Sequence, residues 1–165
     1  MNKRKDQTAY VKVSHLSKTY DISEPFYSRL LTGKKKVMLH AVNDVSFQIA
    51  KGETYALVGE SGSGKSTLAR SLVGLEQPNK GFISFDGSVV FDENKGQMLD
   101  GFMRQKLQMV FQSPYSSLNP RWRIRDILAE PIKAFNLIEG EEDQYRRVNE
   151  LLEMVGLSKS DSDRS

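Results

Sequence analysis

A glycine-rich stretch between an apolar segment and a helical pattern constrains this chain more than any other feature. Residues 54–58 form a continuous apolar run, typical of a strand that is buried on both faces. Residues 65–73 repeat apolar side chains on one helical face, and a glycine and a proline follow shortly after. The sequence therefore predicts a strand, a glycine loop and a helix in direct succession. The loop and the start of the helix match the pattern G-x-x-x-x-G-K-[ST] and read Gly59-Glu60-Ser61-Gly62-Ser63-Gly64-Lys65-Ser66-Thr67.

This loop has the chemistry of a phosphate site. Its glycines allow successive backbone N–H groups to point into one hollow, and the positive end of the following helix attracts anions. Lys65 would place its ammonium against the β- and γ-phosphates, Ser66 would offer a hydroxyl to Mg²⁺, and Glu60 should point to solvent. The motif predicts a site for a nucleoside triphosphate with Mg²⁺. The alternative is a glycine-rich turn with a chance lysine.

Composition narrows the remaining chemistry. The 165 residues include no Cys and two His, which excludes thiol catalysis and disulfides and disfavours a metal site built from histidines. The net charge of +3 is mildly basic and does not favour a nucleic-acid-coating protein. No apolar run reaches the roughly 18 residues that a membrane helix needs. If this chain works at a membrane, we expect other chains to span it.

Hydrophobic patterns outline the rest of the chain. A polar stretch at 21–40 is expected to be an inserted irregular loop, and its run of lysines at 34–36 suits either a solvated loop or contact with phospholipid or nucleic acid. An Asp86-Gly87 pair between apolar runs predicts a hairpin. The helix expected at 124–135 should be kinked or restarted at Pro131. We expect strands at 11–16, 42–49, 82–85, 88–91 and 106–111, and helices at 97–104, 124–135 and 145–155.

Two observations narrow the class of phosphate-binding protein. Two expected strands, at 11–16 and 42–49, precede the apolar run 54–58 and the phosphate-binding loop that follows it (the P-loop). Small-molecule kinases, in contrast, usually begin with the strand that leads into the P-loop. A GTPase would carry an Asn-Lys-x-Asp guanine reader, but neither Asn79-Lys80 nor Asn94-Lys95 is followed by Asp in the required place. Both classes are therefore disfavoured.

Several segments together resemble the ATP-binding subunits of ABC transporters, over residues 13 to about 157. They are Leu16-Ser17-Lys18-Thr19-Tyr20, the segment 42–47 with the turn 51–53, the P-loop, and Gln112 after an apolar run. Residues 111–121 are similar to those of oligopeptide and dipeptide importer ATPases, with agreement at 129–131 and in the long insert after Tyr20. The resemblance implies an α/β fold: a P-loop NTPase core, mainly parallel, with an antiparallel β subdomain and the start of a helical subdomain from about 124 to 165.

The resemblance also implies roles for single residues. Tyr20 would stack on adenine, although on its own it could be an ordinary tyrosine at a strand end. Residues 59–67 would bind ATP, Lys65 and Gln112 would be catalytic, and Ser66 and Gln112 would hold Mg²⁺. Tyr115 and Trp122 could be core or partner contacts. Three arginines are expected to form a solvated face or a partner contact: Arg121, Arg123 and Arg125.

The implied partners are transmembrane permease subunits, a second ABC ATPase subunit and, indirectly, a peptide-binding protein. Nucleic acid is not among them. The expected location is the cytoplasmic face of the cell membrane, as a peripheral subunit.

Other parts of the family pattern are not found in the sequence. The signature Leu-Ser-Gly-Gly-Gln, the Walker B strand with its Mg²⁺-binding Asp and catalytic Glu, and the switch His are missing. Residues 1–165 are therefore expected to be a partial ABC-type ATP-binding domain that hydrolyses ATP very slowly by itself. A non-catalytic nucleotide-binding fragment and an ATPase of another ABC branch are the alternatives.

Overall fold

The computed structural model describes residues 9–33, 35–113 and 118–163. These residues form two compact units, which divide after Met109 and are considered separately below. The stretch 114–117 lies outside the described residues, and with it Tyr115, for which a core contact and a partner contact were the two expectations.

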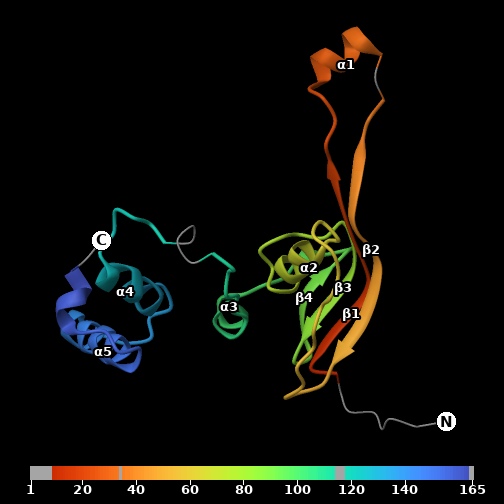
Figure 1. Ribbon diagram of the computed structural model, residues 1–165. Helices are drawn as coiled ribbons and strands as arrows, with labels where there is room; N and C mark the ends of the chain where they lie inside the picture. The colour runs from red at the N-terminus through yellow and green to blue at the C-terminus, as the bar shows by residue number, and fades with distance from the viewer. Residues whose placement is uncertain (1–8, 34, 114–117, 164–165) are drawn as a thin grey trace. The chain divides into compact units, whose positions relative to one another are not determined.

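The first unit is built on an antiparallel sheet of five strands in the order β2-β1-β3-β4-β5 (Figure 1). Four of the predicted strand segments lie in it, and β1 and β2 are longer than expected. The predicted hairpin at Asp86-Gly87 is confirmed, because both residues adopt the left-handed backbone conformation that such a turn requires. The strands are β1 (Val11–Asp21), β2 (Met38–Ile49), β3 (Lys80–Phe85), β4 (Ser88–Asp92) and β5 (Gly96–Gln97).

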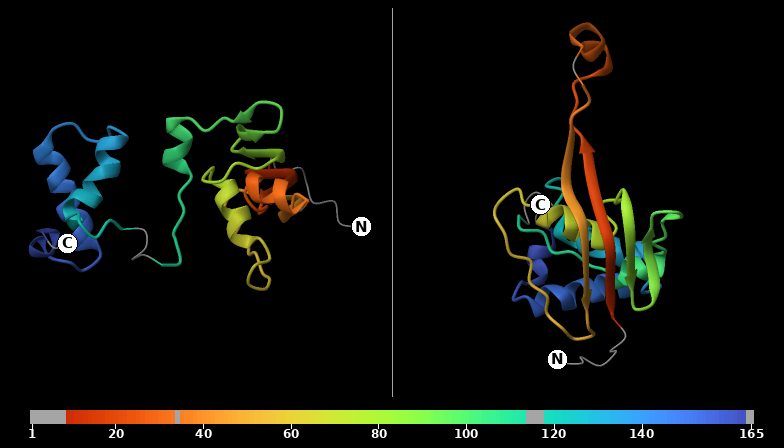
Figure 2. Two further views of the ribbon diagram at one scale, coloured as in Figure 1. Left: turned by 90° about the horizontal axis from the view of Figure 1, so that it is seen from above. Right: turned by 90° about the vertical axis from the view of Figure 1, so that its right-hand side faces the viewer.

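Strands β1 and β2 form a long hairpin that carries helix α1 (Phe26–Thr32) at its tip (Figure 2). The helix follows Pro25, whose carbonyl accepts the N–H of Arg29, and it ends at Gly33 in the left-handed conformation. The segment 21–40, expected to be irregular, therefore contains a helix, and its two ends belong to β1 and β2. A proline before the first turn and a glycine after the last were the sequence signals for it.

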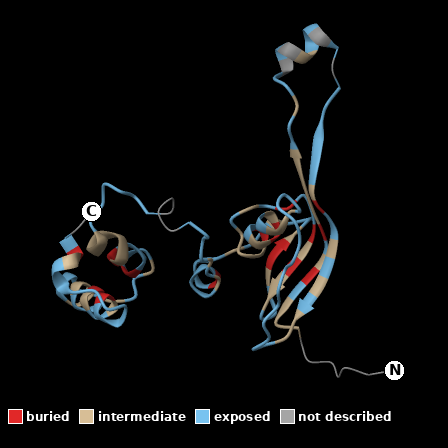
Figure 3. Cartoon of the chain, viewed as in Figure 1, coloured by how far each residue is buried: buried red, intermediate tan, exposed pale blue. Residues whose placement is uncertain are grey.

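Helix α2 (Lys65–Leu72) covers one face of the sheet and closes the core of the first unit. Leu68 of α2 packs in one cluster with Val13 and Leu16 of β1 and with Ile83 of β3, all of them buried. Figure 3 shows buried stretches, coloured red, in the strands and in the helix beside them. The predicted helix after the glycine loop is thus confirmed. The sequence also predicted a short helix at 97–104, and α3 (Gly101–Lys106) begins a few residues later than expected, capped by the Asp100 side chain.

Two predicted strands are not formed. Residues 54–58 have no regular secondary structure, and Val58 is 94% exposed. Residues 107–111 are likewise irregular, and Val110 is 96% exposed. A strand needs a neighbour to take up its backbone hydrogen bonds, and no described strand pairs with either segment. All pairings among the described strands are antiparallel, so the mainly parallel core is not formed by this part of the chain.

The second unit is helical and includes α4 (Ile124–Ala134), α5 (Glu141–Met154) and the short 3₁₀ helix η1 (Lys159–Asp163). Ala129 and Ile132 of α4 pack against Val148 and Leu152 of α5 in a small buried core. Helix α4 continues through Pro131, so a restart of the helix there is wrong, whereas a kink at the proline stays a prediction. In the described residues, no helix is long and apolar enough to cross a bilayer.

Candidate nucleotide-binding site

The glycine loop turns directly into α2. Gly62 and Gly64 have φ angles of 82° and 90°, values that only glycine adopts without strain. At Gly64 the space is also closed, since a Cβ would lie 2.0 Å from the carbonyl oxygen of Ala41 in β2. Backbone conformation and close packing against β2 both require this glycine.

Lys65, the first residue of α2, reaches back over the loop. Its Nζ donates to the carbonyl oxygens of Gly59 at 2.7 Å and Glu60 at 2.6 Å, and it lies 3.3 Å from Oγ of Ser63. All three acceptors are neutral, so the positive charge of the ammonium is not balanced by an acid within the loop. Glu60 is exposed, as expected of an acidic residue in a phosphate loop.

A hollow of about 320 Å³ lies against this loop. One wall is the loop itself, and the other comes from β2 and from the irregular segment before the loop. At the start of α2, Ser66 is exposed and Thr67 is half-buried. A helix N-terminus, a lysine and backbone N–H groups at one hollow are together suited to a polyphosphate. Its described lining consists of Ala41, Val42, Asn43, Val45, Leu57, Val58, Gly59, Ser63, Gly64, Lys65 and Leu68.

Tyr20 lies near the end of β1, opposite Leu39 of β2, and is half-buried. It is not among the described residues that line the hollow. Nζ of Lys18 lies 4.9 Å from the centre of the Tyr20 ring, so a cation covers one of its faces. Sequence reasoning missed this contact. The available signal was the spacing of two along a strand, which places both side chains on the same side of the sheet.

Gln112 belongs to the second unit, where it is exposed and follows no regular element. The structure thus places Tyr20 and residues 59–67 in one unit and Gln112 in the other. The metal-binding role of Gln112 stays a prediction.

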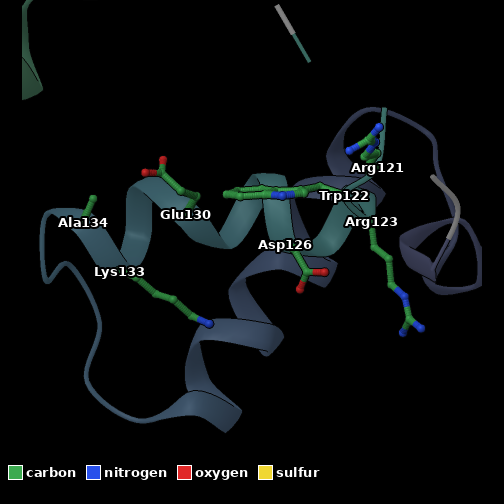
Figure 4. Close-up of a pocket in the computed structure, with 7 residues that line it drawn as sticks. All are labelled: Arg121, Trp122, Arg123, Asp126, Glu130, Lys133 and Ala134. Atoms are coloured by element: carbon green, nitrogen blue, oxygen red, sulfur yellow. The ribbon is translucent and has the colours of Figure 1, made fainter. Parts of the chain in front are cut away.

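A larger hollow of about 690 Å³ lies along α4 in the second unit. Figure 4 shows the Trp122 indole beside the helix, on the same hollow as Asp126 and Glu130. Trp122 is exposed, so of the two readings left open for it, a core position is wrong. Of the three arginines expected on a solvated face or at a partner contact, Arg121 and Arg123 are exposed and Arg125 is half-buried. Arg123 and Arg125 also contact Asp163 of η1 at 3.5 Å and 2.8 Å.

Comparison with known proteins places these features in a family context. The sequence profile described as ABC transporter matches residues 42–165. The oligopeptide transport ATP-binding protein OppF of Bacillus subtilis is 47% identical over 124 residues, which are 75% of this chain and 40% of OppF. The di/tripeptide transport ATP-binding protein DppF of Pseudomonas aeruginosa is 40% identical over 142 residues, 86% of this chain and 41% of DppF. This chain therefore spans about 40% of the length of these relatives.

A solved structure supports the fold. The ATP-binding cassette MJ0796, in a dimeric post-hydrolysis state bound to ADP and Pi, superposes with a TM-score of 0.66 at 24% identity. The match covers 94% of this chain and 61% of the cassette. The likeness shows that the antiparallel sheet, the P-loop and the helical unit belong to one α/β cassette fold.

Proposed function

This chain belongs to the ABC transporter family, and from that membership we propose that it is the nucleotide-binding front part of an ATPase subunit that drives import of oligopeptides or dipeptides. The proposal is supported by the relatives named for oligopeptide and di/tripeptide transport. The single observation that carries it is the P-loop, in which Lys65 lies over the carbonyls of Gly59 and Glu60 at the N-terminus of α2.

The ligand we propose is ATP with Mg²⁺. Residues 59–67 would hold the phosphates, with Lys65 exchanging its neutral loop acceptors for phosphate oxygens. The fit is good, because an anion would balance the ammonium and meet the positive end of α2. Ser66 would supply a hydroxyl to Mg²⁺, which neutralises charge on the phosphates when bound.

Two residues outside the loop complete the proposed site. Tyr20 would stack on adenine, and the carboxamide of Gln112 would contact Mg²⁺ and the side of the γ-phosphate. A neutral oxygen ligand suits Mg²⁺ and can withdraw without leaving a bare charge behind. Lys65 and Gln112 are the residues we assign to catalysis in the whole subunit.

The proposed organisation follows the family. Residues 1–165 form part of an ATP-binding domain, with an insert at 21–40 and a helical subdomain from about 124. Its partners would be transmembrane permease subunits and a second ATPase subunit, with a peptide-binding protein acting indirectly. The subunit would be peripheral, at the cytoplasmic face of the membrane.

A second candidate is a nucleotide-binding module without turnover. It is consistent with the P-loop, which accounts for phosphate binding and does not by itself supply a base that activates water. In this case the 165 residues would bind ATP and leave hydrolysis to other segments.

Titration of the chain with labelled ATP in Mg²⁺ tests the site. Lys65→Ala should lower ATP affinity by about tenfold or more, since a charge-assisted hydrogen bond contributes about 1.5–3 kcal/mol. Lys95→Ala removes an exposed lysine from the loop between β4 and β5 and should bind ATP like the parent chain. Equal affinity of all three proteins would remove the P-loop assignment.

A further inference from the structure

We propose that Lys18 is a positioning residue for the nucleotide base: it holds one face of the Tyr20 ring and leaves the opposite face for stacking. The proposal rests on the proposed role of Tyr20 and adds to it a residue that sets where the ring lies. Lys18 itself would not touch the nucleotide.

The Lys18 ammonium is saturated by partners within the first unit. It lies 2.7 Å from Oε1 of Glu76, donates to the carbonyl oxygen of Gln77 at 2.7 Å, and lies 4.9 Å from the centre of the Tyr20 ring. An ammonium has three N–H donors, so a carboxylate, a carbonyl and a ring face account for all of them. A phosphate would have to displace one of these partners to reach it.

The ion pair is also partly withdrawn from water. The side chains of Lys18 and Glu76 are 13% and 26% exposed, whereas those of the surface pair Arg147 and Glu150 are 44% and 51% exposed. Partial desolvation strengthens both the ion pair and the cation–π contact. The contact between Lys18 and the Tyr20 ring should therefore be stronger than the same contact made by a lysine in an exposed ion pair.

The residues that hold Lys18 come directly after the phosphate-binding helix. Glu76 is fastened to α2, because its N–H donates to the carbonyl oxygen of Arg70 at 3.2 Å. Three residues on, Asn79 donates its N–H to the carbonyl oxygen of Ser17 at 2.9 Å, and its side-chain oxygen accepts the N–H of Thr19 at 2.6 Å. The end of β1 that carries Tyr20 is thus tied to the far end of the helix that begins in the P-loop.

This linkage has a consequence for nucleotide binding. A ring that is already fixed by one face loses little side-chain freedom when a base stacks on the other, which improves affinity. The tie to α2 also fixes the separation between the base and phosphate positions. Lys18 should therefore matter for ligands that carry a base and not for the phosphate chain alone.

The test compares ATP with tripolyphosphate, which has no base, on variants of the 165-residue chain. Lys18→Met keeps the aliphatic stem and should lower ATP affinity by about two- to thirtyfold, with tripolyphosphate affinity unchanged. Lys18→Arg should largely restore ATP binding, because a guanidinium can also pair with Glu76 and lie over the ring. Lys12→Met, an exposed lysine on the same strand, is the matched control and should behave like the parent.

A second set of variants separates this proposal from the P-loop and base-stacking proposals. In a Tyr20→Ala background, Lys18→Met should not weaken ATP binding further, and Glu76→Gln should reproduce a smaller part of the Lys18→Met effect. Tighter ATP binding by Lys18→Met would overturn the proposal and place Lys18 on the face that the base needs. Unchanged ATP affinity, or an equal loss for tripolyphosphate, would assign Lys18 a purely structural role. If Tyr20→Ala binds ATP like the parent while Lys65→Ala does not, the base-stacking role falls and this proposal with it, but the P-loop remains.

Discussion

The phosphate end and the base end of the proposed nucleotide site are built in different ways. At the phosphate end, Lys65 bonds to groups two, five and six residues away along the chain. At the base end, Lys18 and Thr19 bond to groups 59 and 60 residues away. The first arrangement follows from local chain geometry, and the second exists only once the sheet and the loop after α2 have packed together.

Substitutions at the two ends should therefore differ in how many other parts of the first unit they disturb. A change in the glycine loop alters a few local bonds and one close contact with β2. A change at the base end disturbs a network that joins β1 to α2. Substitutions at the two ends should therefore be separable by ligands that carry phosphates, a base, or both.

The largest effect is expected at the phosphate end, from Gly64→Ala. The new Cβ would lie 2.0 Å from the Ala41 carbonyl oxygen, and φ is 90°, so the loop must distort at a cost of about 1–3 kcal/mol in backbone strain alone. We expect a lower midpoint of thermal unfolding and the loss of both ATP and tripolyphosphate binding. Gly52→Ala is the control, because Gly52 has a φ of 77° but no atom near its Cβ position. If both variants bind like the parent chain, the close approach of the loop to β2 is not required.

A somewhat smaller effect, confined to the base, is expected from Tyr20→Ala. Stacking contributes about 1–3 kcal/mol, so ATP should bind about five- to a hundredfold more weakly. Tyr20→Phe and Tyr20→Trp should preserve binding, and GTP should bind nearly as well as ATP, because stacking recognises a π-face. Identical behaviour of all three substitutions in the titration would make Tyr20 a structural residue.

Gln112→Ala tests a group that belongs to neither end. A neutral carboxamide ligand contributes about 1 kcal/mol, so ATP affinity in Mg²⁺ should fall several-fold. Affinity in EDTA should change little. Measuring both conditions gives the Mg²⁺ dependence, and an equal loss with and without metal would argue against a metal contact.

The smallest effect is expected at the hairpin tip, close to Tyr20 in sequence. Hydrogen bonds from Ser23, assisted by Lys36, lower the pKa of Asp21 to about 2. A depressed carboxyl pKa adds stability above the unfolded value of about 3.9, and this stability is lost as pH falls through about 2. Amide NMR of Ser23 should show the loss over that window and not in Asp21→Asn. A change in the Ser23 amide signal centred near neutral pH would contradict the assignment of this titration to Asp21.

The features predicted correctly from the sequence are those that depend on residues close together along the chain. The glycine loop, the helix at Lys65 and the turn at Asp86-Gly87 depend on neighbouring residues, and each was placed correctly. The apolar run at 54–58 was predicted to be a strand and is not, because periodicity does not say whether a hydrogen-bonding neighbour exists. The bond between Lys18 and Glu76 was not predictable for a related reason: its partners are distant in sequence and meet only through tertiary packing.

Resemblance supplied what local patterns could not. Gln112 and Tyr20 have no distinctive spacing of their own, and their proposed roles come from the family pattern around them. The helix at 26–32 was missed because its polar surroundings hid a proline start and a glycine end. In the second unit, α4 continues across Pro131, next to the buried Ile132, although a restart at the proline was one of the two outcomes expected there.

ATP binding and ATP turnover measured on the same sample of the 165-residue chain test the central claim most directly. We predict that labelled ATP binds in a Lys65-dependent manner and that phosphate release stays at background, with or without Gln112. Hydrolysis well above background that disappears in Lys65→Ala would contradict this prediction. It would mean that a carboxylate within these residues, among them Glu139, Glu141 and Glu142, activates the attacking water.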